Sequence, residues 1–219
     1  MDAPKKRILE ILKILSREYP NARSALDFRS PLEMLVATIL SAQCTDKRVN
    51  IVTATLFKKY RSAKDYAKAN IKKFEQEIRS TGFYHNKAKN IINMAKMLVS
   101  DFNGQVPDSM EQLIKLPGVA RKTANVVLNS AFHKVEGIAV DTHVMRLSQR
   151  LGLSKYDDPG KIEQDLMALV PRKLWGKVNY NLVDHGRAIC KAPRPLCPEC
   201  VIGQLCPSKE SFMKKYYSK

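Results

Sequence analysis

The sequence predicts an all-α protein. Apolar residues recur at intervals of three and four along most of the chain, which is the spacing of an amphipathic helix. Helix-start signals precede many of these stretches, and no segment shows the strict alternation of a half-buried strand. We therefore expect about ten helices and no sheet.

The first helix is expected in the N-terminal segment MDAPKKRILEILKILSREYP. Its isoleucines and leucines alternate with charged residues, so it forms a helical stripe and not the uninterrupted apolar run of a signal peptide. No stretch elsewhere is long and apolar enough to cross a bilayer. We expect an intracellular protein without membrane association, in which disulfides between the five cysteines are disfavoured.

Capping signals mark the starts and ends of further helices. Ser30 to Glu33 has the capping-box pattern with proline at the first helical position, and Ser62 to Asp65 and Asp108 to Glu111 resemble it. Thr81-Gly82 and Asn103-Gly104 supply residues that tolerate the left-handed conformation of a helix C-terminal cap. These signals divide the middle of the chain into short helices.

A helix-hairpin-helix is expected over residues 109–132. Ser109 to Lys115 predicts one helix, Leu116 to Ala120 a tight turn, and Arg121 the start of a second helix. Gly118 can adopt the positive φ that the turn needs, and the free N–H groups at the second helix start can bind a phosphate. Such a motif holds the DNA backbone without reading sequence. An ordinary helical hairpin is the alternative.

The charge of the chain favours a polyanionic partner. Lys and Arg total 38 against 21 Asp and Glu, which gives a net charge of +17. Nucleic acid is the leading partner for such a balance. A generally solvated basic surface and an anionic lipid surface remain alternatives on charge alone.

Four of the five cysteines lie in one short loop after the last long helix. Cys190, Cys197, Cys200 and Cys206 are spaced C-x6-C-x2-C-x5-C. Four thiolates at this density predict a metal site, and a structural zinc is one reading. The single close pair and the two Cys-Pro steps favour a 4Fe-4S cluster over zinc. Cys44 is left over and is expected to be a small buried residue in a helix.

Lys122 and Asp141 are the candidate catalytic residues. Lys122 lies in the first turn of the second hairpin helix, where the helix dipole disfavours a cation and favours the neutral amine that a nucleophile needs. A lysine that only contacts phosphate is the alternative. Asp141 follows an apolar run and has the position of a helix N-cap. It could also stabilise the positive charge on a sugar whose glycosidic bond breaks. We expect His143 to be structural.

Three motifs in this order resemble the endonuclease III family of DNA glycosylases with associated lyase activity. They are residues 116–125 (LPGVARKTAN), residues 140–143 (VDTH) and the four-cysteine loop, and the match extends through residues 40–43 (LSAQ) and 185–187 (HGR). The resemblance covers nearly the whole chain. Two departures are Ala120, where the family usually has a second glycine, and the lack of a proline before Asp141. Neither removes a catalytic group.

The resemblance implies two helical lobes. Residues 25–135 would form a six-helix barrel that contains the helix-hairpin-helix, and residues 1–24 with 136–219 a discontinuous lobe that carries a 4Fe-4S cluster loop at 190–206. Duplex DNA with a damaged base or abasic site would lie across the groove between the lobes. We expect the protein to be a monomer. The cluster would be mainly structural, with Lys191 and Arg194 in its loop near phosphates.

The resemblance also implies the chemistry. Lys122 would attack C1′ of the deoxyribose to form a Schiff base, β-elimination would break the 3′ phosphodiester, and Asp141 would be the essential carboxylate. Oxidised pyrimidines such as thymine glycol would be the substrates.

The same resemblance implies a set of DNA contacts. A target base must leave the stack, and Gln43 and Phe83 lie in the two loops where the family carries its inserting residues. Phe83 has another reading, as the apolar contact that follows a helix C-cap. The remaining expected DNA contacts are Gly118, Val119, Ala120, Arg121 and Arg187.

Two other functions remain open. Glycosylases that act on mismatched thymine or on adenine lack the lysine, so Lys122 favours the bifunctional enzyme. A cluster-bearing protein that binds DNA without chemistry is the rival from another class.

Overall fold

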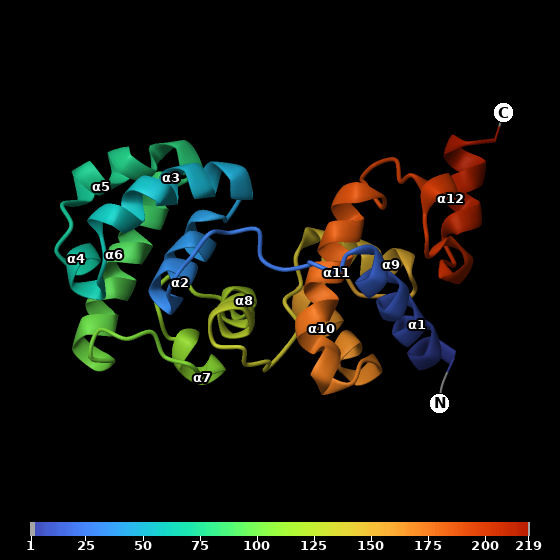
Figure 1. The fold of residues 1–219 in the computed structure, drawn as a ribbon, viewed down its shortest axis with the longest axis horizontal. Coiled ribbons are helices and arrows are strands. Elements are labelled where there is room, and N and C mark those ends of the chain that lie inside the picture. Colours follow the sequence, from blue (N-terminus) through green and yellow to red (C-terminus); the bar gives the residue numbers. More distant parts are fainter. Residues whose placement is uncertain (1–2, 219) are drawn as a thin grey trace. The chain divides into compact units, whose positions relative to one another are not determined.

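The computed structural model describes residues 3–218 and divides into two compact units (Figure 1). Unit 2 is the continuous segment Ser24–Glu136, and unit 1 combines Met1–Arg23 with Gly137–Lys219. The boundaries expected from the sequence, 25–135 and 1–24 with 136–219, differ from these by one residue at each junction.

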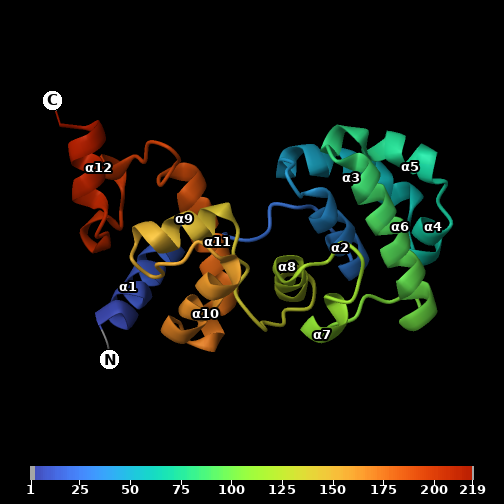
Figure 2. The ribbon, with the colours of Figure 1, turned by 180° about the vertical axis from the view of Figure 1, so that it is seen from behind.

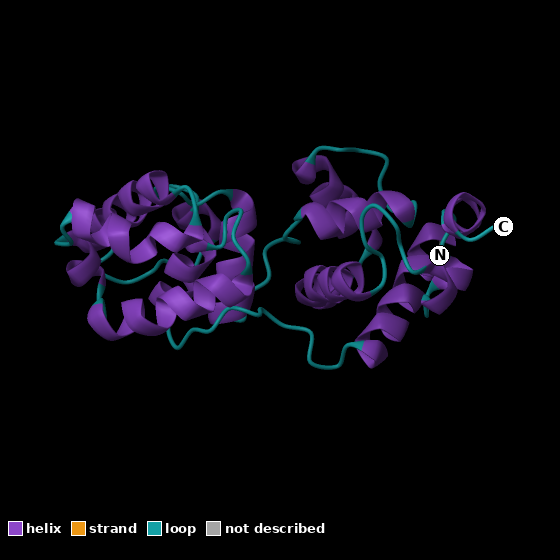
Figure 3. Ribbon diagram, turned by 90° about the horizontal axis from the view of Figure 1, so that it is seen from above, coloured by secondary structure: helices purple, strands orange, loops and turns teal. Residues whose placement is uncertain are grey.

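The described residues form helices and loops and no strand (Figure 3). The α-helices are α1 (Ala3–Glu18), α2 (Pro31–Leu40), α3 (Asp46–Lys59), α4 (Ala63–Ala67), α5 (Ile71–Ile78), α6 (Tyr84–Asp101), α7 (Met110–Leu113), α8 (Arg121–Ala131), α9 (Thr142–Arg150), α10 (Pro159–Leu169), α11 (Trp175–Ala188) and α12 (Lys209–Tyr216). The 3-10 helices are η1 (Arg79–Thr81), η2 (Arg172–Leu174), η3 (Cys197–Glu199) and η4 (Gly203–Leu205). The predicted all-α class is therefore confirmed. No helix in this part of the chain is long and apolar enough to span a membrane.

Unit 2 contains α2 to α8 and its own apolar core. The helix α2 packs against α8, and α6 packs against α4 and α5, as Figures 1 and 2 show from opposite sides. Leu35, Ile91 and Leu98 are fully buried in this core. Burying one such side chain stabilises the folded state by about 1.5–3 kcal/mol. The core therefore gives the loops between the helices a stable support. The unit has seven α-helices where a six-helix barrel was expected, and α7 is a single turn.

Unit 1 is built from the two ends of the chain. Ile8, Ile11 and Leu15 of α1 are fully buried, together with Leu147 of α9 and Leu182 of α11. The apolar stripe at the N-terminus therefore packs against helices more than a hundred residues away. This packing makes the domain discontinuous.

The predicted helix starts have three different outcomes. Ser62 and Asp65 form a complete reciprocal capping box, as expected. Ser30 accepts from the N–H of Glu33, but the Glu33 carboxylate accepts from the N–H of Arg29, one residue earlier than in the standard box.

The prediction of a capping box from Asp108 to Glu111 was wrong. The residue before α7 is Ser109, and it makes no side-chain cap. Asp108 instead pairs with Lys134, so a tertiary ion pair takes up the carboxylate that a local cap would have used.

The helix ends agree with the glycine and asparagine signals. Gly82, Asn103 and Gly104 all have positive φ, at 71°, 52° and 77°. The N–H of Gly104 donates to the carbonyl of Leu98 and closes the end of α6. These residues stop the helices where the sequence predicted.

Candidate active site and cluster loop

The hairpin between α7 and α8 has the geometry that its sequence predicts. Gly118 has a φ of +78°, which only glycine adopts at little cost. A β-carbon at this position would also lie 2.9 Å from Cβ of Asn90 on α6, closer than carbon atoms approach without strain. Gly118 is therefore required twice, by its backbone conformation and by its neighbour.

The start of α8 is a group of backbone donors without a side-chain cap. Its N-cap residue, Ala120, makes no side-chain hydrogen bond to the first turn. Gly118, Ala120 and Arg121 are exposed, whereas Val119 is only 6 % exposed and packs into the core of unit 2. Because its side chain is buried, Val119 can contact bound DNA only through its backbone. The other three present their surfaces to solvent.

Lys122 is exposed in the first turn of α8, in unit 2. The amides of this turn point along the helix axis toward its start, where an anion is favoured and a cation is not. An exposed amine next to such an anion site can approach a ligand whose phosphate is bound there. The location agrees with either of the two roles that its sequence position suggested.

Asp141 is the N-cap of α9, in unit 1. Its Oδ1 atom accepts from the N–H groups of His143 and Val144, at 2.9 and 2.8 Å. The structural role expected for Asp141 is therefore confirmed. The two donors fix the orientation of the carboxylate, and no hydrogen bond to Oδ2 is present among the described residues.

His143 occupies a structural position, as expected. Its Nδ1 lies 3.0 Å from Nη2 of Arg146, and a β-carbon on Gly186 would lie 2.9 Å from the same Nδ1. Burial lowers the pKa of His143, which favours the neutral ring that can accept from the arginine. Arg146 also donates to the carbonyl of Cys190 at 3.1 Å, so α9 is tied to the start of the cysteine loop.

Gln43 and Phe83 share an unusual backbone conformation. Both are non-glycine residues with positive φ, 52° and 48°, and both are exposed. Phe83 exposes 62 % of its surface, the largest exposed fraction among the large apolar residues described as exposed. Its alternative reading as a packed contact after a helix cap was therefore wrong. A strained backbone that holds an apolar ring in solvent is typical of a binding site.

The four cysteines of the loop line one cavity in unit 1. Its wall is completed by Leu147, Arg150, Leu151, His185, Ile189, Pro195, Ile202, Gly203, Lys209 and Phe212. All five cysteines are free thiols in this structure. No group of three or more His, Cys, Asp or Glu side chains in residues 3–218 is arranged to hold a single metal ion.

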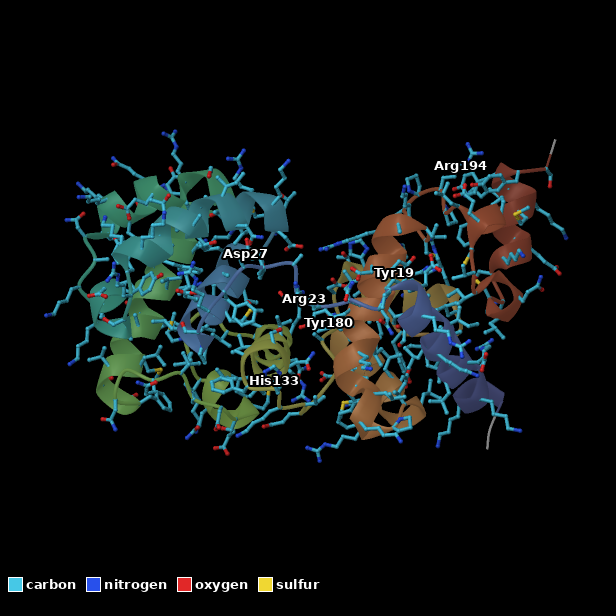
Figure 4. The ribbon with its side chains drawn as sticks, viewed as in Figure 1. Tyr19, Arg23, Asp27, His133, Tyr180 and Arg194 are labelled. Carbon is cyan, nitrogen blue, oxygen red and sulfur yellow. The ribbon has the colours of Figure 1, made fainter. Side chains whose placement is uncertain are left out.

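Polar side chains from outside the loop reach the loop cysteines. Nη1 of Arg150 lies 3.3 Å from Sγ of Cys190 and 2.9 Å from the carbonyl of Lys191. Nε2 of His185 lies 3.4 Å from Sγ of Cys200, while its Nδ1 lies 3.1 Å from the hydroxyl of Tyr19, which is labelled in Figure 4. A donor such as the Arg150 guanidinium stabilises a sulfur atom that carries negative charge.

Burial opposes the ionisation of three of the loop thiols. Burial raises the pKa of Cys200 to about 11, and it also raises the pKa of Cys197 and of Cys206. Bound metal ions deprotonate coordinating thiols outright, which overcomes this cost. Four cysteines that line one cavity are the donor set that zinc and iron-sulfur sites use.

The remaining residues expected to contact DNA are exposed, and one of them, Arg194, also binds other residues of the protein. Arg187, Lys191 and Arg194 are exposed in unit 1. Nη2 of Arg194 donates to the carbonyl of Tyr216, and its guanidinium lies 4.8 Å from the Tyr217 ring centre (Figure 4). The cysteine loop is thus fastened to the C-terminal helix through this arginine.

Cys44 does not lie in a helix, which corrects that expectation. It lies in the bend between α2 and α3 and is partly exposed. The residues before it end α2 at Leu40, so the apolar pattern stops before the cysteine.

Comparison with known proteins identifies the family. Residues 36–172 match the HhH-GPD superfamily of base excision DNA repair proteins. The chain is 53% identical to Endonuclease III of Synechocystis sp. and 44% identical to Endonuclease III of Bacillus subtilis, over 96% of both chains in each case. The chain belongs to the endonuclease III family.

Solved structures of endonuclease III agree over the whole fold. A trapped Endonuclease III-DNA covalent intermediate has a TM-score of 0.91 at 44% identity and covers 97% of this chain and 100% of its own. A non-covalent Endonuclease III-DNA complex has a TM-score of 0.92 at 44% identity, with 98% and 100% covered. Membership in the endonuclease III family makes this chain a base excision repair DNA glycosylase with lyase activity at apurinic or apyrimidinic sites.

Arg150 and Lys87 of this endonuclease III homologue were not singled out from its sequence, and His185 was noted only as part of the 185–187 motif. Arg150 and His185 approach sulfur atoms of the loop cysteines, and Lys87 is buried in unit 2 at 4 % exposure. The only signal for Lys87 was its place on the apolar stripe of α6, four residues before Ile91. Arg150 gave no local signal, because its partner Cys190 lies 40 residues away. The contact of His185 with Cys200, 15 residues away, also had no local signal.

Proposed function

We propose that this enzyme removes oxidised pyrimidines such as thymine glycol from duplex DNA and cleaves the strand 3′ to the resulting abasic site. The observation that carries this proposal is the exposed Lys122 amine in the first turn of a helix without a side-chain cap. A relative with 44% identity has been trapped as a covalent intermediate with DNA, which supports a nucleophile on the protein.

The reaction begins with the neutral Lys122 amine. Its lone pair attacks C1′ and the bond from C1′ to the base breaks. The base leaves with the bonding electrons and takes up the proton that Nζ releases by way of the Asp141 carboxylate. The bond from C1′ to O4′ then breaks, O4′ takes a proton from water, and a protonated Schiff base forms between Nζ and C1′. Loss of a proton from C2′ then expels the 3′ phosphate, and water releases the lysine.

Asp141 supplies the negative charge that this reaction needs. Positive charge grows on the sugar as the glycosidic bond breaks, and a fixed carboxylate stabilises it. The N–H groups of His143 and Val144 hold Oδ1, so little reorganisation is required when the charge appears. The carboxylate also accepts a proton during base loss.

Backbone contacts hold the DNA while the base is out of the stack. The exposed Gly118, Ala120 and Arg121, with the backbone of Val119, bind a phosphate at the start of α8. Gln43 and Phe83 fill the gap that the base leaves. Arg187, Lys191 and Arg194 contact further phosphates, and the net charge of +17 supports binding to this polyanion.

The cysteine loop fits a 4Fe-4S cluster. Cys190, Cys197, Cys200 and Cys206 line one cavity, and Arg150 donates toward the sulfur of Cys190. The bound cluster would cross-link residues 190–206 and would supply no atom to base excision. The cysteines that bind it would instead hold Lys191 and Arg194 in place, in the loop between Cys190 and Cys197.

The partner is duplex DNA with a damaged base or abasic site, inside the cell, and the enzyme binds it as a monomer. Size-exclusion chromatography with light scattering, with and without such a duplex, measures whether one chain is present per duplex.

Borohydride trapping tests the proposal. The protein is incubated with a duplex that contains one thymine glycol, and borohydride is added to reduce the Schiff base. We expect a covalent adduct that Lys122→Ala abolishes. Lys115→Ala is the matched control, because Lys115 is an exposed lysine of the same hairpin and its loss removes the same charge.

Other results would assign other functions. Cleavage of a duplex with a mismatched thymine but not of one with thymine glycol would indicate a mismatch glycosylase. A third result is that the wild type forms no adduct and that Lys122→Ala only weakens DNA binding and its dependence on salt. This result would indicate a DNA-binding protein without chemistry.

A further inference from the structure

Lys87 joins two segments of unit 2 that carry the proposed inserting residues. Its Nζ atom donates to the carbonyl of Leu40 at 2.7 Å and to the carbonyl of Thr81 at 2.8 Å. Leu40 is the last residue of α2, and Thr81 is the last residue of η1. One buried side chain therefore holds the ends of two different helices.

Each of these carbonyls is close in sequence to an exposed tip. Gln43 follows Leu40 by three residues, and Phe83 follows Thr81 by two. The last carbonyls of a helix have no partner within the helix, and the lysine satisfies one at each end. The two loops thus begin from carbonyls that are hydrogen-bonded to the same nitrogen atom.

A lysine at this position is costly, which suggests that it has a task. Lys87 is 4 % exposed and lies on the stripe of α6 that otherwise buries Ala88, Ile91 and Ala95. An apolar side chain would fit the core without the cost of removing an amine from water. Burial lowers the pKa of Lys87, and even the neutral amine keeps two N–H donors for the two carbonyls.

The loops themselves are held in a strained form. Gln43 and Phe83 both have left-handed backbones, which persist only when the surrounding structure maintains them. Because the side chains at both tips are exposed, packing does not hold them in place. The two hydrogen bonds of Lys87 join the roots of both loops, at Leu40 and Thr81, through one side chain.

We propose that Lys87 is a positioning residue that couples the Gln43 and Phe83 loops, so that the two side chains enter the DNA duplex as one unit. The inference rests on the proposed function, because it takes Gln43 and Phe83 to be the residues that fill the gap. Lys87 touches neither substrate nor reacting atoms and acts only through the two loops.

The test compares Lys87→Met with Lys89→Met. Both substitutions remove one positive charge from α6, but Lys89 is exposed, so its variant controls for charge and helix composition. A duplex with 2-aminopurine opposite an abasic site reports unstacking by its fluorescence. A second duplex, with thymine glycol, gives the single-turnover rate of base excision. Thermal unfolding of each variant verifies that the proteins are folded at the assay temperature.

We expect Lys87→Met to reduce unstacking and to slow excision by about 10- to 100-fold. Lys89→Met should leave both within about twofold. In a Gln43→Ala/Phe83→Ala background, Lys87→Met should cause no further loss, because the residues through which it acts are gone. If Lys87→Met does not fold, Lys87→Gln takes its place, since its shorter amide cannot reach both carbonyls.

Several outcomes overturn the coupling. One is an unchanged unstacking signal in folded Lys87→Met, and another is a loss that persists fully in the Gln43→Ala/Phe83→Ala background. A wild type that causes no unstacking also overturns it, since the loops would then not enter the duplex. A wild type that unstacks the duplex but removes no thymine glycol would refute only the proposed substrate, and the unstacking assay would still test the coupling.

Discussion

Oδ1 of Asp141 accepts a hydrogen bond from the backbone N–H of Val144 at 2.8 Å and thereby caps α9. The same carboxylate is the proposed stabiliser of charge on the sugar. One side chain would thus have a structural and a chemical task. The amide oxygen of asparagine can perform the first but has no charge for the second.

This separation predicts different results for two substitutions at Asp141. Asp141→Asn should change the free energy of unfolding by less than about 0.5 kcal/mol, because asparagine is an equally good N-cap. It should lower the excision rate by about 100-fold or more. Asp141→Ala should lower the excision rate to a similar extent, and it should also lower the free energy of unfolding by about 1 kcal/mol. Chemical denaturation and single-turnover excision measure the two effects, and an active Asp141→Asn enzyme would contradict the proposed role.

The hairpin turn should not tolerate a β-carbon at residue 118. Gly118→Ala places Cβ 2.9 Å from Asn90 in a backbone with a φ of +78°. Gly104→Ala is the matched control, because its φ is +77° and no atom lies within 4 Å of its added Cβ. The control should cost about 1 kcal/mol from the backbone alone. Gly118→Ala should lower the free energy of unfolding by more than this and should weaken DNA binding. Equal losses of stability in the two variants would show that Asn90 moves to make room for the added Cβ.

Loss of one cysteine of the loop should release the proposed cluster. We expect Cys206→Ser protein to lose its bound iron and its broad visible absorbance. Cys44→Ser should keep both, because Cys44 lies in unit 2 and outside the cavity. Iron analysis and absorption spectra of the purified variants measure this. Equal iron contents in the two variants would be incompatible with Cys206 as a ligand.

The buried Lys87 should make stability depend on pH in one direction. Burial holds its pKa below the usual 10.5, so the unfolded chain binds more protons than the folded chain in the range between the two values. The free energy of unfolding therefore rises with pH through that range. Lys87→Met lacks this contribution. The stability of wild type relative to Lys87→Met should increase as pH approaches 10.5, and denaturation at several alkaline pH values measures the difference.

The sequence by itself determined the features that depend on neighbouring residues. The capping box of Ser62, the positive φ of Gly118 and the N-cap position of Asp141 were all predicted, because each needs only a few consecutive residues. The order and spacing of the motifs also identified the family. Where a local signal failed, as at Asp108, a partner 26 residues away had taken the carboxylate.

Only the tertiary structure decided which side chains meet across long stretches of chain. Lys87 finds the Leu40 carbonyl 47 residues away, and Arg150 finds Cys190 at a separation of 40. The cavity around the cysteines and the exposure of Phe83 follow from the same packing. Local sequence sets backbone conformation through short-range sterics and hydrogen bonds. The partner of a buried polar group is set by how complete helices pack, and that depends on the whole core at once.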